Sequence, residues 1–130
     1  MQRIGEVVGL RDYANLAALL QHGVRATFAD LAHVRHHRRV AVLDVRRILE
    51  WAESHIDGAV HIPLHELRDR IREVPPAETW VHCRSGYRAV IAASLLQAAR
   101  HAVVAIDDDY TRAADAGLPL VTGTAAARAA

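Results

Sequence analysis

Residues 40–45, with the sequence VAVLDV, restrict the fold of this chain more than any other feature. The apolar residues follow one another without alternation, and a strand of this kind has to be covered on both faces, as in parallel sheets. Further short apolar segments follow at residues 59–62, 79–82 and 102–106. Strands that alternate with helices predict an α/β fold, in which a central parallel sheet carries helices on both faces.

The segments between these strands have the apolar spacing of amphipathic helices. Thr27 and Asp30 resemble a capping pair at the start of one helix, and Pro75-Pro76 ends another. The expected helices cover residues 28–36, 48–54, 64–74, 89–100 and 110–116, with a further candidate at residues 12–21.

A chain of 130 residues is long enough for one domain with a sizeable core. We expect residues 27–121 to form this domain. Residues 1–26 are interpreted as an N-terminal extension or linker, and residues 122–130 as a frayed C-terminal tail.

Composition argues against several classes of function. Sixteen basic residues are nearly balanced by fifteen acidic ones, and no basic run with interleaved aromatic residues indicates nucleic-acid binding. The single cysteine argues against a disulfide or a multi-cysteine zinc site and fits a reducing compartment. The N-terminus lacks the apolar region of a signal peptide, and no apolar run approaches the roughly 20 residues of a membrane span. We therefore expect a cytoplasmic domain that binds neither nucleic acid nor membrane.

Cys83 is the most informative residue for function, because a strand is expected to end and a helix to begin close to it. The unpaired N–H groups and the macrodipole of a helix N-terminus favour negative charge, and Arg84 and Arg88 add positive charge. Such surroundings stabilise a thiolate. Lone cysteines are more often buried packing residues, but two arginines and a glycine in the next five residues favour the reactive interpretation. Asp44 ends its own strand, so both residues fall on the edge where such folds bind ligands.

Five fragments of the sequence, in this order, resemble a rhodanese domain, the single-domain sulfurtransferase module. The fragments are Leu43-Asp44-Val45-Arg46, Trp51, His55-Ile56-Asp57-Gly58-Ala59 with Ile62-Pro63, the loop from Cys83 to Arg88, and Ala116-Gly117-Leu118-Pro119. The resemblance covers roughly residues 27–121. It implies a rhodanese-like three-layer fold, no cofactor, and a persulfide carried on Cys83.

The resemblance also implies a set of site residues around Cys83. The substrate-binding loop comprises Arg84, Ser85, Gly86, Tyr87 and Arg88, with Asp44 and Arg46 in support. Backbone N–H groups from Arg84 to Arg88 are expected to point at the anionic outer sulfur of the persulfide. The partners implied are a small sulfur donor and a thiol or cyanide acceptor.

Individual roles follow for the loop residues. Arg84 is expected to attract an anionic donor. Arg88 either turns inward to a carboxylate, Asp44 or another nearby, or remains an exposed residue at the helix start. Gly86 is expected to adopt a backbone conformation that a Cβ would hinder. Tyr87 either shapes the pocket rim or packs against the protein.

Loop length separates this function from phosphatase or arsenate reductase chemistry. A phosphatase group of similar fold has five residues between its catalytic cysteine and arginine, because phosphate needs the wider cradle. Here Cys83 and Arg88 bracket four residues, and position 89 is alanine. A loop of this size resembles one that holds a persulfide, which disfavours the phosphatase hypothesis.

Two departures from the family pattern concern the donor and the partner. Asp108, Asp109 and Ala113 occupy places where the family usually has a Gly-Gly turn and a tryptophan. The acidic residues are expected to change the pocket mouth or the donor that it admits. The loop, the helix after it and the Asp-rich turn also resemble rhodanese modules fused behind a metallo-β-lactamase-like domain, which are associated with persulfide oxidation. Such a domain is therefore a candidate partner.

The histidines do not predict a metal site. They include His33, His36 and His37, which share one helical face, and His55, His61 and His65 around the strand at residues 59–62. Neighbouring arginines oppose cation binding by the first group, and the second has no arranged cysteine or carboxylate. His55 is expected to be structural. His82 should point to the opposite face from Cys83, so we do not expect it to act as a catalytic base.

Two function hypotheses remain. The first is a sulfurtransferase that moves sulfane sulfur from thiosulfate or a persulfide to a thiophilic acceptor through a Cys83 persulfide. The second is a non-catalytic or regulatory module that docks a partner, or receives sulfur from a metallo-β-lactamase-like domain. The intact cysteine and loop favour the first hypothesis, whereas Asp108, Asp109 and the N-terminal extension favour the second.

Overall fold

The computed structural model describes residues 26–123. Its central sheet has four parallel strands in the order β3-β1-β4-β5, and a separate antiparallel ribbon pairs β2 with β6. The elements in chain order are α3 (Phe28–Val34), β1 (Ala41–Asp44), α4 (Ile48–Glu53), β2 (His55–Ile56), β3 (Val60–His61), α5 (Leu64–Leu67), the 3₁₀ helix η2 (Ile71–Glu73), β4 (Thr79–His82), α6 (Tyr87–Ala98), β5 (Val103–Ala105), α7 (Arg112–Asp115) and β6 (Leu120–Val121). The predicted α/β fold with a central parallel sheet is confirmed.

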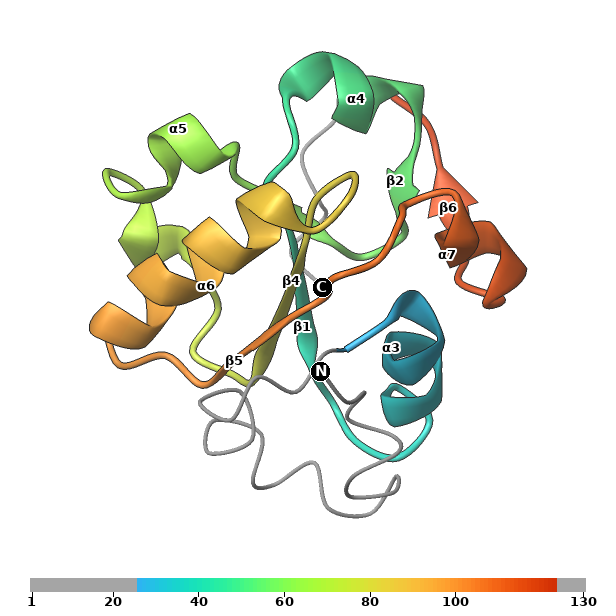
Figure 1. Ribbon diagram of the computed structural model, residues 1–130, viewed down its shortest axis with the longest axis horizontal. Helices are drawn as coiled ribbons and strands as arrows, with labels where there is room; N and C mark the ends of the chain where they lie inside the picture. The colour runs from blue at the N-terminus through green and yellow to red at the C-terminus, as the bar shows by residue number, and fades with distance from the viewer. Residues whose placement is uncertain (1–25, 124–130) are drawn as a thin grey trace.

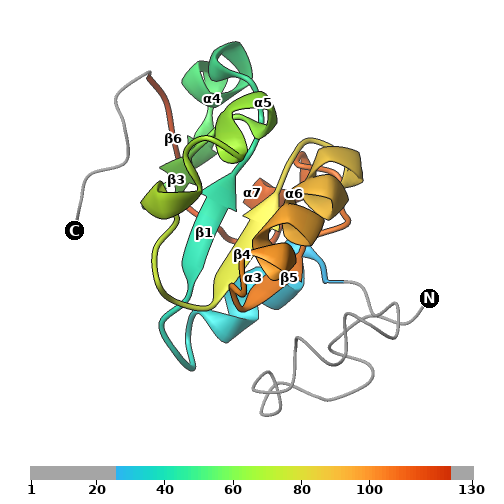
Figure 2. The same cartoon turned by 90° about the vertical axis from the view of Figure 1, so that its left-hand side faces the viewer.

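Helices lie on both sides of this sheet (Figures 1 and 2). α5 and α6 cover one face, and α3 and α7 cover the other. α4 lies beyond the carboxyl ends of the strands, next to β2 (Figure 1). The fold therefore has three layers, with the sheet between two layers of helices. α4 and the loop between β4 and α6 both lie at the carboxyl edge of this sheet.

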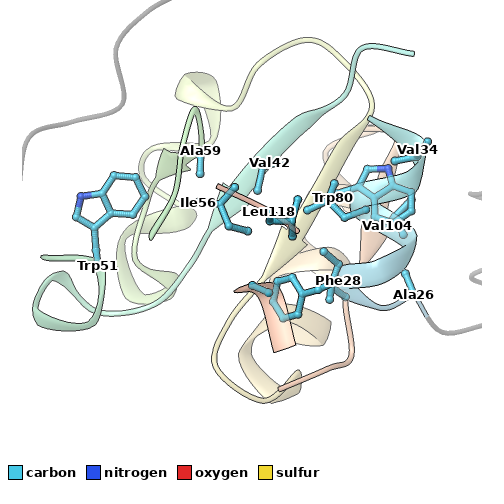
Figure 3. Close-up of a cluster of buried hydrophobic side chains, with 13 residues drawn as sticks. Ala26, Phe28, Val34, Val42, Trp51, Ile56, Ala59, Trp80, Val104 and Leu118 are labelled. Atoms are coloured by element: carbon cyan, nitrogen blue, oxygen red, sulfur yellow. The ribbon is translucent and has the colours of Figure 1, made fainter. Parts of the chain in front are cut away.

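The sheet divides the core into two clusters, because successive strand residues point to opposite faces. Figure 3 shows the first cluster, which consists of Ala26, Phe28, Leu31, Val34, Val42, Trp51, Ile56, Ala59, Trp80, Val104, Ile106, Ala113 and Leu118. The second consists of Leu43, Val45, Ile62, Leu67, Val74, Val81, Cys83, Ala89, Ala92, Ala93, Leu96 and Val103. Val42 and Leu43 thus enter different clusters, which explains why residues 40–45 are apolar without alternation.

α3 begins at the residue that the capping pair predicts. Thr27 Oγ1 accepts a hydrogen bond from Asp30 N at 3.1 Å, and Asp30 Oδ2 accepts one from Thr27 N at 2.9 Å. Asp108 adds a third contact, because its Oδ2 accepts a hydrogen bond from Phe28 N at 3.1 Å. The turn after β5 is therefore joined to the start of α3.

The predicted helices differ in their bounds from the observed ones, and two of these differences have a clear cause. The helix expected at residues 64–74 is divided into α5 and η2, because Arg70 lies outside the helical region with φ −113° and ψ 19°. Ion pairs from Arg70 to Glu66 and Glu73 span this break. α6 begins at Tyr87 rather than Ala89, since the carbonyl of Gly86 already accepts a hydrogen bond from Val90 N.

The β2–β6 ribbon was not predicted. His55 pairs with Val121, and Ile56 pairs with Leu120. Strands of two residues are too short to show a periodic pattern in sequence. The ribbon holds the end of α4 against the closing segment of the domain.

The described residues extend slightly beyond the expected domain. Ala26 is buried and forms a parallel bridge with Ile106, and Gly123 N donates a hydrogen bond to the carbonyl of Ala52 at 2.9 Å. The candidate helix at residues 12–21, the rest of the expected extension and residues 124–130 of the expected tail lie outside the described residues. Within residues 26–123, every helix is too short or too polar to cross a bilayer.

Candidate active site

Cys83 directly follows β4, at the carboxyl edge of the sheet, and the next residues form the loop that leads into α6 (Figure 1). Its Sγ accepts hydrogen bonds from Gly86 N at 3.0 Å and from Ala89 N at 3.3 Å. Both N–H groups lie at the N-terminal end of α6, where helices have unpaired donors. The sulfur therefore occupies a position that favours an anion.

The Cys83 sulfur is buried, and its two donors come from the loop and from the helix after it. The side chain of Cys83 is only 1% exposed and lies beneath the loop. One donor to Sγ, Gly86, lies in the loop whose N–H groups are expected to face the outer sulfur of a persulfide, and the other, Ala89, lies just beyond that loop. The helix turn after the loop contributes as much to the cradle as the loop itself.

Gly86 has the special conformation that the sequence predicts. Its φ is +108°, in the left-handed region that favours glycine. A Cβ at this position would collide with Asp107 Oδ1 and would lie 3.0 Å from Asp107 Cα. Glycine therefore allows the loop to turn tightly enough for its N–H to reach Cys83, with the chain after β5 close behind it.

Arg88 turns inward to a carboxylate, but its partner is Glu50 rather than Asp44. Its guanidinium binds Glu50 through two hydrogen bonds, from Nη1 to Oε1 at 2.7 Å and from Nη2 to Oε2 at 3.0 Å. Glu50 Oε1 also accepts a hydrogen bond from Arg47 N at 2.9 Å. The hydrogen bonds from Arg88 are the largest cause that lowers the pKa of Glu50, to about 2. Glu50 is therefore a negative charge already neutralised within the site.

Asp44 and Arg46 form a buried pair beside the cysteine strand. Arg46 donates to both carboxylate oxygens of Asp44, with a shortest distance of 2.7 Å from Nη2 to Oδ2. Burial acts to raise the pKa of Asp44, but the facing His82 and the bonded Arg46 outweigh it, so this pKa lies below its ordinary value. Nη2 of Arg46 also donates to the carbonyl of Ser54 at 2.7 Å. The pair thus joins the end of β1 to the end of α4.

Tyr110 links this pair to the cysteine loop. Cζ of Arg46 lies 3.9 Å from the centre of the Tyr110 ring, within the range of a cation–π contact. The Tyr110 hydroxyl and Ser54 Oγ are 3.0 Å apart. Tyr110 N donates to the carbonyl of Arg84 at 2.7 Å. The segment after β5 is therefore attached to the loop through its backbone and to the buried pair through its ring.

The side chain of His82 lies on the opposite face of the sheet from that of Cys83, as predicted, although its Nδ1 is 3.2 Å from the carbonyl oxygen of Cys83. Its ring lies 5.2 Å from that of Phe28 and stacks on Tyr110 at 5.5 Å, on the face of the sheet that α3 covers. Burial lowers its pKa, so the imidazole is neutral at pH 7. Nε2 lies 3.6 Å from Asp44 Oδ2. These contacts make His82 a packing residue between Asp44 and the aromatic rings.

Two open depressions flank the loop, and Arg84 lines both. The α4 cleft, of about 680 Å³, is lined mainly by Arg47, Ile48, Leu49, Pro63, Arg84 and Arg88. The α7 cleft, of about 450 Å³, is lined mainly by Arg46, Glu53, Arg84, Asp109, Tyr110 and Ala114. Cys83 is in neither lining, because it lies beneath the loop that separates them.

The remaining predicted residues differ in how far they are exposed. Arg84 and Ser85 are exposed. Tyr87 is 77% exposed, so it does not pack, and it is absent from the linings of both clefts. His55 is structural, as predicted, because it is buried and stacks on Trp51 with ring centres 3.4 Å apart. Residues 26–123 contain no group of three or more potential metal ligands.

Glu50 and Tyr110 belong to the site but are not among the residues predicted from the sequence. Glu50 had a weak signal, since a carboxylate in the helix after β1 lies near the edge where Asp44 and Cys83 meet. Tyr110 is the first residue of the last predicted helix, but it lies before α7 (Arg112–Asp115). No local pattern indicates that its ring reaches Arg46, because that contact depends on how the chain returns after β5.

Comparisons with known proteins agree with this geometry. A family model described as "Rhodanese-like domain" matches residues 27–115. The chain is 37% identical over 101 residues to "HTH-type transcriptional regulator Rv0324" of Mycobacterium tuberculosis, covering 75% of this chain and 44% of that protein. It is 42% identical over 57 residues to "Putative sulfur carrier protein YrkF" of Bacillus subtilis, covering 43% of this chain and 31% of that protein. The chain thus spans less than half the length of these two relatives.

A solved structure gives the same result. A rhodanese-related protein from Thermoplasma volcanium superposes with a TM-score of 0.66 at 26% identity, covering 75% of this chain and 96% of that one. The family match includes the strand-loop-helix unit that holds Cys83, which lies inside residues 27–115. This chain belongs to the rhodanese-like domain family.

Proposed function

We propose that this domain is a sulfurtransferase that moves a sulfane sulfur from thiosulfate or an organic persulfide to a thiophilic acceptor through a Cys83 persulfide. The observation that carries the proposal is the position of Cys83 Sγ, which accepts hydrogen bonds from two backbone N–H groups at 3.0 and 3.3 Å. Membership of the rhodanese-like family supports it, as does the similarity to a relative named as a putative sulfur carrier protein.

The chemistry needs two balanced steps. The Cys83 thiolate attacks the outer sulfur of thiosulfate, a new S–S bond forms at Sγ, and sulfite leaves with the electron pair of the old S–S bond. The acceptor, a thiol in a cell or cyanide in an assay, then attacks the outer sulfur of the persulfide. The Cys83 thiolate is the leaving group of this second step. Covalent catalysis of this type predicts ping-pong kinetics.

The site supplies charge stabilisation rather than acid–base catalysis. Gly86 N and Ala89 N donate to the sulfur at the start of the 12-residue helix α6, where the helix dipole also favours an anion. His82, the imidazole next in sequence, faces the other side of the sheet. Arg84 carries the positive charge closest in sequence to the sulfur and lines both clefts, which suits attraction of an anionic donor.

Intact-protein mass spectrometry tests the proposal. After incubation with thiosulfate, the wild-type protein should gain the mass of one sulfur atom, and cyanide should remove it. Cys83→Ser should gain nothing while keeping its circular-dichroism spectrum, because a serine oxygen can also accept the hydrogen bonds from Gly86 N and Ala89 N. No mass gain in wild type with either thiosulfate or glutathione persulfide would refute the sulfurtransferase proposal.

A second candidate function is a regulatory module. The observation that favours it is the 37% identity to a protein named as a transcriptional regulator, of which this chain spans 44%. In such a role the sulfur on Cys83 would be a signal read by a partner rather than an intermediate. Loading without multiple turnovers in the presence of cyanide or thiol acceptors would favour this function. Loading from glutathione persulfide but not thiosulfate would instead support the proposed metallo-β-lactamase-like partner.

A further inference from the structure

The α4 cleft and the α7 cleft differ in charge. In the α4 cleft the carboxylates of Glu50 and Glu66 are neutralised by ion pairs with Arg88 and Arg70. Arg47 and Arg84 therefore leave this cleft with an excess of positive charge. The α7 cleft contains Glu53 and Asp109 in addition to Arg84. Within residues 26–123, neither of these two carboxylates lies within 4 Å of a basic side chain.

Asp109 is fixed on its side of Arg84. Its Oδ1 accepts hydrogen bonds from Thr111 N at 2.9 Å and from Thr111 Oγ1 at 2.8 Å. Both bonds lower the pKa of Asp109, and the bond from the backbone N–H of Thr111 has the larger effect. The carboxylate is therefore ionised at neutral pH. The next residue, Tyr110, is itself bonded to the carbonyl of Arg84. These hydrogen bonds orient the carboxylate of Asp109 within a segment that is itself bonded to the cysteine loop.

The neighbouring Asp108 has a different role. Its Oδ2 binds Phe28 N at the start of α3, and its Oδ1 accepts a hydrogen bond from Asp109 N at 2.9 Å. Its side chain is only 11% exposed. Asp108 therefore stabilises the fold through these hydrogen bonds, whereas Asp109 is exposed in the α7 cleft.

The geometry points to Asp109 as a residue that determines donor specificity. Its negative charge opposes the attraction between Arg84 and an anionic donor, so it disfavours doubly anionic sulfur donors relative to singly charged ones. This inference rests on the proposed sulfurtransferase function. Across the partly solvated distances of an open cleft, one fixed charge should change the rate by about twofold to fivefold per unit of donor charge.

Two nearly isosteric donors isolate this effect. Thiosulfate is a dianion and releases sulfite, whereas methanethiosulfonate is a monoanion and releases methanesulfinate. Both give Cys83 the same outer sulfur through the same exchange of S–S bonds. The ratio of the two second-order rates of persulfide formation therefore cancels effects on the cysteine itself and reports the effect of donor charge.

The test compares Asp109→Asn with the wild type and with Asp115→Asn, which removes an exposed carboxylate of α7 that lines neither cleft. Asparagine keeps the acceptor for Thr111. Asp109→Asn should raise the thiosulfate-to-methanethiosulfonate ratio about twofold to fivefold at low ionic strength. The increase should vanish near 1 M salt, where the Debye length is about 3 Å, and Asp115→Asn should leave the ratio unchanged.

The possible failures are distinguishable. An unchanged ratio in Asp109→Asn at low salt, or an increase that persists at high salt, would overturn the role of Asp109 while leaving sulfur transfer intact. The same increase in Asp115→Asn would show a general field effect and would also overturn it. Absence of persulfide in wild type with both donors would refute the proposed function, and with it this inference.

Discussion

Arg88 and Glu50 form a two-bond ion pair that ties the first turn of α6 to α4. The two N–O distances are 2.7 and 3.0 Å, and the side chains are 27% and 24% exposed. Paired bonds between guanidinium and carboxylate fix orientation as well as distance. Since α6 also provides the N–H of Ala89 to Cys83 Sγ, the ion pair helps to position the helix start on which the sulfur depends.

Arg88→Lys should therefore weaken the site although it keeps the charge. Lysine cannot form the paired bonds, so we expect the free energy of unfolding to fall by about 1 kcal/mol. The rate of persulfide formation should fall with it, because the start of α6 is held less firmly. Denaturant unfolding and mass spectrometry measure the two effects.

The matched control is Arg70→Lys, at an ion-paired arginine that lines neither cleft and is 34% exposed. It should change persulfide formation little. Equal losses of rate in the two variants would show that the Arg88–Glu50 pair has no special relation to the sulfur.

Acid should destabilise the domain, and Glu50 should account for part of the loss. A carboxyl whose pKa is lowered from 4.5 to about 2 by folding stabilises the fold fully above pH 4.5. This contribution is lost as the pH falls from 4.5 through 2, because the unfolded chain binds the proton more readily. Asp44, with a lowered pKa, and His82, whose pKa burial lowers, act in the same direction.

Glu50→Gln isolates the contribution of Glu50. At pH 7 the variant should be less stable than wild type by about 1–2 kcal/mol, allowing for partial exposure. The difference should shrink as the pH approaches 2, where wild-type Glu50 becomes protonated and resembles glutamine. Urea unfolding at several pH values measures this, and a difference that is constant between pH 7 and 3 would contradict the assignment.

Replacing Asp44 should be more damaging than replacing Glu50. Asp44 is fully buried, and its loss leaves the guanidinium of Arg46, itself 4% exposed, without its carboxylate. Breaking one half of a buried pair costs about 3–5 kcal/mol, so Asp44→Ala should be strongly destabilised. The double variant Asp44→Leu with Arg46→Met should recover part of the loss, since it leaves no buried charge. Thermal unfolding of the two variants would show the difference, and equal destabilisation would argue against an unpaired charge as the cause.

The sequence predicted those parts of the fold and site that depend on local patterns. The apolar run at residues 40–45, the Thr27–Asp30 capping box and the position of Cys83 between a strand and a helix each have a signature of a few residues. A backbone conformation that a Cβ would hinder was also predicted at Gly86, and it is observed as a φ of +108°.

Features that depend on distant contacts could not be predicted in this way. Arg88 is hydrogen-bonded to Glu50, 38 positions away in sequence, and the hydroxyl of Ser54 to that of Tyr110, 56 positions away. Asp44 was the more obvious partner for Arg88, but Arg46 reaches its carboxylate from two residues away. The depth of Cys83 has no local signature either, since it depends on the packing of α6 onto β4 rather than on the loop sequence.

Gly86→Ala should lower the rate of persulfide formation more than its effect on the free energy of unfolding alone would predict. Two effects combine at this position, a φ of +108° and a collision of the new Cβ with Asp107. Gly117 offers a control, because its φ is +87° but no atom beyond its chain neighbours lies within 4 Å of the place that a Cβ would take. Gly117→Ala should therefore cost only the strain of a left-handed alanine, about 1–2 kcal/mol.

Gly86→Ala should cost more than Gly117→Ala, because either the loop or the chain at Asp107 has to move in addition. Movement of the loop lengthens the 3.0 Å hydrogen bond from Gly86 N to Cys83 Sγ. Removing one such donor to an anionic centre costs about 10²-fold or more in rate, so persulfide formation should fall by at least about tenfold even where the protein remains folded. Urea unfolding together with rates of mass gain on thiosulfate compares the two variants. Similar rates in Gly86→Ala and Gly117→Ala would mean that the N–H of Gly86 does not stabilise the sulfur, and the cradle would then rest on Ala89 alone.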